Sequence, residues 1–318
     1  MKSYILKRTL SLIPIFFGIL LILGIMFAAL PGDCLSTNIG MDPKVKHQLR
    51  EQLHLNDSKI VQFGYWIKST FKGEFGYDAW GNDYKPMLRR AIKNSLKSYS
   101  AAFLLSFIIS IPLGIIAAYH LNGIFDRIIR VIISIFSCMP EFMVALLIGL
   151  FVNYGAEISQ VYSNTAYLTP VPKTKFNMYL AMITVLVLIT CSGLVRYVRT
   201  SVLDIINKDY IRTARSKGLK ERIVLYRHGL RNALIPIITH IGNTLIIMIS
   251  SSITIEIVLG YHGIGFTMYT VILRRQYWLM LSLTFFVVIF TLLINYFIDI
   301  FYAMIDPRVR YNRYLSRH

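Results

Sequence analysis

Residues 196–236 read RYVRTSVLDIINKDYIRTARSKGLKERIVLYRHGLRNALIP and lie between two long apolar runs. The stretch carries ten Lys or Arg residues against three acidic residues. Short basic loops beside membrane-length segments stay on the cytoplasmic side of a membrane. The sequence therefore predicts a cytoplasmic loop held between two spanning helices, and the other segments are placed by working outward from it.

Part of this loop has the spacing of a short helix. Tyr210, Ala214 and Lys217 or Gly218 recur on one small or apolar side, while Arg212 points elsewhere. Gly218 can end the helix as a glycine just past a helix end does. We interpret this helix as the site where a partner protein transmits force, with the residues Asp209, Tyr210, Arg212, Thr213, Ala214, Arg215, Lys217 and Gly218. The pattern alone fits equally well a loop that only fixes topology and binds lipid head groups.

The composition excludes a soluble protein. Of 318 residues, 55% are hydrophobic and 13% aromatic, and the mean hydropathy is +0.55. Several uninterrupted apolar runs approach the roughly 20 residues that a helix needs to cross the hydrocarbon. The net charge of +18 comes largely from residues beside the ends of these runs, so it indicates orientation and contact with the lipid bilayer, not nucleic acid.

The apolar runs predict an all-α integral membrane protein with six transmembrane helices and both termini in the cytoplasm. The predicted spans are 9–30, 97–121, 128–153, 178–195, 235–259 and 278–303. We expect an uncleaved N-terminal helix at 1–30, an extracellular segment at 31–94 with short amphipathic helices, a five-helix core at 95–303 and a basic cytoplasmic tail at 304–318. The core includes the basic loop at about 196–235.

The fifth span carries a polar stripe. At 100° per residue its members share about a third of the helix circumference; they are His240, Asn243, Thr244, Ser250, Ser251 and Thr254. In lipid such a stripe must face protein or water, so it either lines a substrate path or joins helices. Glu141, beside Pro140, is the candidate for a charge that faces the same path.

Two other intramembrane carboxylates have a structural interpretation. Glu256 falls on the side of the fifth span opposite the stripe, and Asp299 lies near the inner end of the sixth span. A carboxylate in a membrane helix is costly unless it is paired. We therefore predict that both form structural ion pairs with neighbouring segments.

Several kinds of chemistry lack their motifs. The sequence has no Gly-x-x-x-x-Gly-Lys-Ser/Thr loop, no Gly-x-Ser-x-Gly and no His-Glu-x-x-His. Cys34, Cys138 and Cys191 lack the spacing of a metal site, and the histidines do not cluster. We expect a non-catalytic chain with no metal site and no cofactor of its own.

The basic loop resembles that of a known family. Residues 209–219 (DYIRTARSKGL) and 227–236 (RHGLRNALIP) are similar to the cytoplasmic loop of ABC-importer permeases. More narrowly, they resemble the B-type subunit of the oligopeptide, dipeptide and nickel branch. The family's Glu-Ala-Ala signature, with glycine four residues on, falls on Arg212-Thr213-Ala214 with Gly218. Arg212 replaces the glutamate.

The resemblance covers nearly the whole chain. Its other motifs are Leu30-Pro31-Gly32-Asp33, Gly73-Glu74-Phe75-Gly76, Pro140-Glu141-Phe142 and Asp306-Pro307-Arg308. His54 stands where the family usually has glycine, and Glu141 where it usually has a small or neutral residue.

The resemblance implies a type I ABC importer permease fold, with 95–303 as its transmembrane core and the short helix of the loop docked on an ATPase. The implied partners are a second homologous permease subunit in a heterodimer, two ABC ATPase subunits and an extracellular solute-binding protein. ATP and Mg would be bound by the ATPases. The substrate would be a short peptide, or alternatively nickel or a nickel chelate. A stand-alone channel or secondary transporter is the rival interpretation from another class.

Overall fold

The computed structural model describes residues 2–36, 43–52, 54–77, 83–153, 175–218 and 231–305. Regular structure in these ranges is helical, apart from an isolated bridge between Tyr77 and Asp83. The helices are α1 (Lys2–Ala29), α2 (Pro43–Gln52), α3 (Lys59–Lys72), α4 (Lys85–Tyr119), α5 (Ile124–Cys138), α6 (Glu141–Asn153), α7 (Lys175–Ile206), α8 (Asp209–Ser216), α10 (Arg231–Leu259), α11 (Ile264–Leu273) and α12 (Tyr277–Ile305). The residues outside these ranges include 154–174, 219–230 of the basic loop and 306–318 of the predicted tail.

Five of the described helices are long and apolar enough to cross a membrane: α1, α4, α7, α10 and α12. A sixth span results if α5 and α6, which meet at an angle of 105°, are counted as one broken span. The all-α membrane fold predicted from composition is therefore confirmed, and the third predicted span is the broken one.

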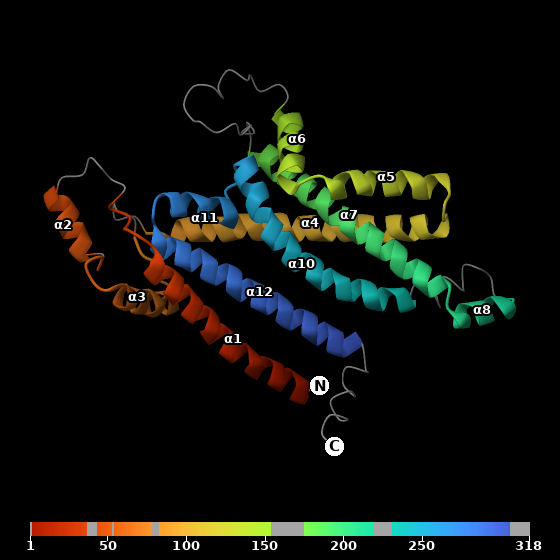
Figure 1. The fold of residues 1–318 in the computed structure, drawn as a ribbon, viewed down its shortest axis with the longest axis horizontal. Coiled ribbons are helices and arrows are strands. Elements are labelled where there is room, and N and C mark those ends of the chain that lie inside the picture. Colours follow the sequence, from red (N-terminus) through yellow and green to blue (C-terminus); the bar gives the residue numbers. More distant parts are fainter. Residues whose placement is uncertain are drawn as a thin grey trace. The chain divides into compact units, whose positions relative to one another are not determined.

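The contacts divide the chain into two compact units. Unit 1 comprises residues 1–95 with 262–296, and unit 2 comprises residues 96–261 with 297–318. The predicted N-terminal span and outer segment thus share a unit with α11 and most of α12 (Figure 1). Unit 2 holds the basic loop, the polar stripe and the broken span.

Aromatic packing holds unit 1 together. Trp66 of α3 is almost fully buried and donates from Nε1 to the Ser282 hydroxyl of α12 at 3.1 Å. Its ring meets Phe285 edge to face at 5.8 Å, and Phe27 of α1 belongs to the same cluster. Aromatic pairs at such distances add to the energy of burial. As a result, α3 is fixed against α1 and α12 although it is too short to span a membrane.

The helix that carries the second predicted span begins earlier than its apolar run. The Asp83 side chain accepts from the Lys85 backbone N–H at 2.8 Å, as residues at helix starts do. Leu88 and Ala91 are then buried against α12 residues, including Leu279. The first turns of α4 are therefore held by packing in unit 1 before the membrane-length run starts.

The third predicted span breaks at Met139-Pro140. Proline has no N–H to donate and disfavours helical backbone in the residue before it. Met139 is accordingly extended, and the Pro140 carbonyl accepts from Met143 in the first turn of α6. Figure 1 shows α6 turned away from the axis of α5. The chain direction changes by 105° between α5 and α6 at this break.

Close helix contacts organise unit 2. A Cβ placed on Gly114 of α4 would lie 2.6 Å from Val198 of α7, so only glycine permits this approach. α7 also packs on α5, α6 and α10. It continues to Ile206, beyond the end of the predicted span at 195, so the first part of the basic loop is a helical extension of a spanning helix.

Candidate functional site

The short helix predicted in the basic loop is present as α8. Two residues separate it from the end of α7, and the Lys208 N–H donates to the Ile205 carbonyl in this break. Gly218 has φ of +71°, in the left-handed region that glycine adopts at little cost. Figure 1 shows α8 beyond the end of α7. The predicted glycine stop is therefore confirmed.

The faces of α8 differ in part from the predicted ones. Ile211 and Ala214 are buried, whereas Tyr210, expected on the apolar side, is 42% exposed. Ile211 and Ala214 are three residues apart and therefore lie on one face of the helix. The buried face thus contains Ala214, as predicted, but Ile211 in place of Tyr210. The side chain of Arg215 is outside the described part of the chain.

The exposed side of α8 carries both signs of charge. Arg212 Nη1 lies 3.8 Å from Asp209 Oδ1, and both side chains are largely in solvent. Thr213 donates its hydroxyl to the Asp209 carbonyl, and Lys217 is exposed after the last turn. An exposed tyrosine among charged groups is a suitable surface for another protein. Docking by these residues stays a prediction.

A buried ion pair joins α7 to α5 shortly before α8. Arg199 donates to Asp126 in bidentate fashion, from Nε to Oδ1 at 2.7 Å and from Nη2 to Oδ2 at 3.0 Å. The Asp126 side chain is completely buried. Arg130 Nη2 lies 3.3 Å from Oδ2, and the Asn122 backbone N–H donates to the same oxygen at 3.0 Å. Four donor groups therefore hold this carboxylate in the first turn of α5.

The sequence interpretation missed Asp126. A usable signal was present, because an aspartate early in a helix, after Asn122-Gly123, can accept from the N–H groups of the preceding turn. Its partner is 73 residues away, so only a three-dimensional contact could reveal the pair. The pair ties the end of a spanning helix, next to α8, to the start of the broken span.

The polar stripe on α10 is mainly on an open side of unit 2. Asn243, Ser250 and Thr254 are exposed. His240 is half-buried, and its ring stacks on Tyr197 of α7 with centroids 3.8 Å apart. The Thr244 hydroxyl donates to the His240 carbonyl, and Ser250 and Ser251 donate to carbonyls of their own helix. An open polar stripe fits the lining of a path or a contact with another subunit, and the lining role stays a prediction.

Glu141 begins α6 directly after the break at Pro140 and is half-buried. Its carboxyl approaches the Ser251 hydroxyl of α10. The structure thus brings together two residues that the sequence interpretation assigned separately to the path.

Glu256, assigned to the opposite side of α10, is completely buried. The Tyr99 hydroxyl of α4 donates to Glu256 Oε1 at 2.8 Å, and Ser252 Oγ lies 2.5 Å from that hydroxyl. The contact joins α4 to α10 through a hydroxyl.

Asp299 is partly buried in α12, and its ion pair stays a prediction. Among the described residues no three His, Cys, Asp or Glu side chains gather as metal ligands would.

Solved structures with the same fold are transporter subunits. The chain is similar to a chain of an amino acid ABC transporter crystallised with histidines, with a TM-score of 0.54 and 15% identity over 70% of this chain and 95% of that one. It is also similar to a chain of the inward-facing MetNI methionine ABC transporter, with a TM-score of 0.56 and 18% identity over 69% and 96%. The fold is that of an ABC importer permease.

The chain belongs to the family of binding-protein-dependent transport system inner membrane components, which matches residues 110–311. It is 33% identical to the oligopeptide transport system permease protein AppB of Bacillus subtilis, over 98% of this chain and 100% of that protein. The corresponding OppB permease proteins are 32% identical in Escherichia coli K12 and 29% identical in Haemophilus influenzae, with the same coverage.

Family membership establishes a multi-pass permease of the bacterial plasma membrane, and a non-catalytic component of a transport system. In general, ABC importer permeases of this family work with an ATPase and a binding protein. The stand-alone transporter is thereby disfavoured.

Proposed function

We propose that this chain forms half of a translocation path for short peptides taken up from an extracellular solute-binding protein. The observation that carries the proposal is the match along the whole length to permease proteins of oligopeptide transport, 98% of this chain and 100% of the relative. A match of that extent includes unit 1 as well as the core.

The proposed assembly contains a second, homologous permease as the heterodimeric partner and two ABC ATPase subunits. The chain itself would bind no cofactor, since ATP and Mg would belong to the ATPases. The alternative for α8, a loop that only fixes topology and binds lipid head groups, assigns no role to the exposed side chains of Asp209, Tyr210 and Arg212.

The proposed coupling runs from α8 to α7 and then to α5. A push on α8 reaches the end of α7 through two residues of connection. Arg199 lies two turns back along α7 and holds Asp126 at the start of α5. Rigid helices joined by a bidentate ion pair transmit displacement better than flexible contacts do. ATP-dependent docking in two states would thereby bias two arrangements of the broken span.

The proposed path uses the open stripe of α10, with Asn243, Ser250 and Thr254, and the Glu141 carboxyl beside Ser251. These groups offer hydrogen bonds to a peptide backbone and one negative charge to its ammonium group.

Reconstitution tests the proposal. The chain is co-expressed with a partner permease, the ATPases and a binding protein, and uptake of labelled tripeptide into proteoliposomes is measured. We expect uptake that requires ATP and the binding protein. Uptake of nickel instead of peptide would support the nickel alternative, and uptake by the purified chain alone, without nucleotide, would contradict the proposal.

Two variants, one in α8 and one just past its end, test the docking. Gly218→Asp strains a left-handed position, and Arg212→Glu reverses an exposed charge, so both should abolish co-purification of the ATPase. Arg127→Glu, an exposed charge reversal on α5, is the matched control and should retain the ATPase. Retention by all three variants would exclude α8 as the docking element.

A further inference from the structure

Unit 1 contains a cavity of about 400 Å³ that the proposed transport mechanism does not use. α3 lines it with Gln62, Tyr65 and Lys72, which share one face of the helix. Phe27 and Tyr277 contribute aromatic surface from α1 and α12. The volume and the mixture of aromatic walls with a few polar groups match the usual binding sites of small molecules.

The charge around the cavity is unbalanced. Lys59, Lys68, Lys72 and Arg275 line it, against the two carboxylates of Asp33 and Glu74. Asp33 is already occupied, since Arg50 Nη2 lies 2.5 Å from its Oδ2 and the Ser36 backbone N–H donates to Oδ1 at 2.7 Å. The cavity therefore presents an excess of cations to any molecule that enters it.

Lys59 brings this charge close to the aromatic wall. Its Nζ lies 4.9 Å from the Phe27 ring centroid and 5.5 Å from that of Tyr277. Burial lowers the pKa of its amine, and the charge of Asp33 opposes that shift. An anion beside this amine would offset the cost of burying its positive charge.

Two lining residues have unusual backbone conformations. In the described part of the chain, positive φ occurs at three non-glycine residues: His54 at 54°, Asn122 at 60° and Arg275 at 52°. His54 and Arg275 both line this cavity. Glycine adopts such angles without strain, whereas a histidine or an arginine at these angles is strained and costs folding free energy. Residues held in this way gather at ligand sites.

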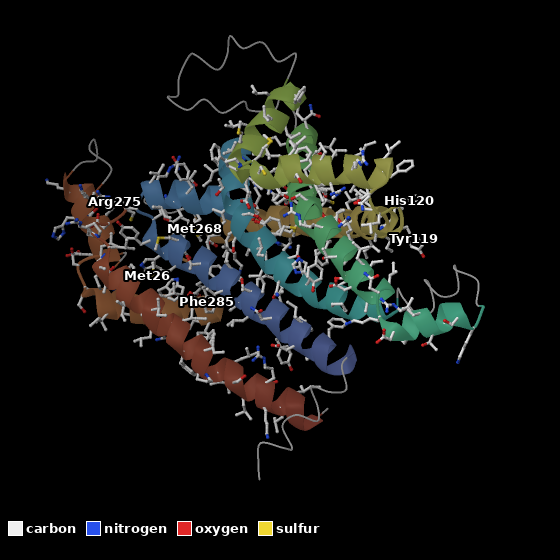
Figure 2. The ribbon with its side chains drawn as sticks, turned by 45° about the vertical axis from the view of Figure 1, so that its right-hand side comes forward. Met26, Tyr119, His120, Met268, Arg275 and Phe285 are labelled. Atoms are coloured by element: carbon white, nitrogen blue, oxygen red, sulfur yellow. The ribbon has the colours of Figure 1, made fainter. Side chains whose placement is uncertain are left out.

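The position of Arg275 suits a role in binding. It follows the end of α11, where the Gln276 N–H donates to the Val271 carbonyl in the manner of a glycine-type helix end. Its Nη1 lies 3.2 Å from the Ser36 hydroxyl. Figure 2 shows Arg275 just past the end of α11, with Met26 of α1 and Phe285 of α12 on neighbouring helices of the same unit.

We propose that this cavity binds a small organic carboxylate with an apolar body, the class that includes the free C-terminal end of a short peptide. The guanidinium of Arg275 and the lysine amines bind the carboxylate, and the aromatic walls hold the apolar body. Only the identification with a peptide rests on the proposed function; the carboxylate site stands on the cavity itself.

Calorimetric titration of the full chain in lipid nanodiscs tests this site. The ligand used is N-acetyl-phenylalanine, and its C-terminal amide is the matched neutral compound. We expect saturable binding of the acid and at least tenfold weaker binding of the amide, because the amide lacks the charge. Equal binding of the two compounds, or binding of neither, would overturn the proposal.

Variants separate the charge of Arg275 from the backbone it occupies. Arg275→Gly removes the guanidinium and relieves the left-handed position, so it should weaken binding of the acid at least tenfold while thermal stability stays equal or rises. Arg275→Gln should weaken binding to the same extent. Asn122→Gly relieves the left-handed position in unit 2 and should leave binding unchanged. Normal affinity in both Arg275 variants would contradict the site.

This outcome is independent of transport. The titration needs neither ATP nor partner subunits, so carboxylate binding without peptide uptake would contradict the proposed function alone. Peptide uptake without carboxylate binding would contradict the cavity proposal alone.

Discussion

Two buried carboxylates in unit 2, Asp126 and Glu256, are equally hidden from solvent but have different partners. Asp126, between α5 and α7, receives a bidentate guanidinium from Arg199. Glu256, between α10 and α4, receives the Tyr99 hydroxyl. The first contact depends on opposite charges, and the second on a hydrogen bond to a neutral group.

The difference in partners predicts that the two contacts differ in how well they tolerate substitution. An arginine stays charged in proteins, so a buried guanidinium needs its carboxylate. A hydroxyl can donate to a carboxylate or accept from a carboxylic acid, and therefore suits either form. The α5–α7 contact should thus be the rigid one, as the proposed coupling requires, and the α4–α10 contact should tolerate substitution.

The largest effect is expected for Asp126→Asn. The substitution keeps the size of the side chain but leaves Arg199 without its negative partner, which should lower the free energy of unfolding by about 3 kcal/mol. Thermal unfolding of the full chain in detergent measures this change. Arg130→Gln removes the more exposed partner, 45% exposed, and is the matched control with an expected loss below about 1 kcal/mol. Equal losses in the two variants would contradict the special role of the Arg199 pair.

A smaller effect is expected for Arg199→Lys, which tests whether the ion pair couples ATP hydrolysis to uptake. Lysine keeps the charge but cannot reproduce the bidentate contact. The loss of stability should be about 1–2 kcal/mol. In the reconstituted assembly we expect ATP hydrolysis to persist while peptide uptake per ATP falls. A proportional fall of both activities would indicate a purely structural pair.

The helices were predictable from the sequence because membrane thickness sets a simple length rule. Composition and apolar runs placed α1, α10 and α12 closely, and Gly218 marked the end of α8. The start of α4 and the end of α7 were less accessible, because these helices continue beyond their apolar runs there. Packing of Leu88 against α12 holds the early turns of α4, and no local pattern reports that contact.

The contacts between distant residues were much less predictable. Helical periodicity placed Glu256 correctly away from the polar stripe, and the structure buries it there. It gave no indication that Arg199 meets Asp126 or that α3, α1 and α12 enclose a cavity. Periodicity orders side chains around one helix, whereas these features depend on which helices are neighbours.

At the other carboxylate, Tyr99→Phe should have a moderate effect. The substitution removes the hydroxyl that donates to Glu256 and lies beside Ser252. Hydrogen bonds between membrane helices contribute about 0.6 kcal/mol on average and up to about 1.7 kcal/mol. We expect a loss of stability within that range, measured by thermal unfolding as for Asp126→Asn. A loss as large as that of Asp126→Asn would remove the distinction between the two sites.

The smallest effect is expected for Glu256→Gln. Glutamine keeps the length of the side chain and a carbonyl oxygen that can accept from the Tyr99 hydroxyl, so the hydrogen bond between α4 and α10 is preserved. The unfolding free energy should change by less than about 0.6 kcal/mol, the average value of such a bond. Glu256→Leu removes the acceptor and is the matched comparison, with a loss expected to equal that of Tyr99→Phe. If Glu256→Gln instead destabilised the chain as much as Asp126→Asn, the negative charge itself would be required, and both carboxylates would belong to one class of buried ion pair.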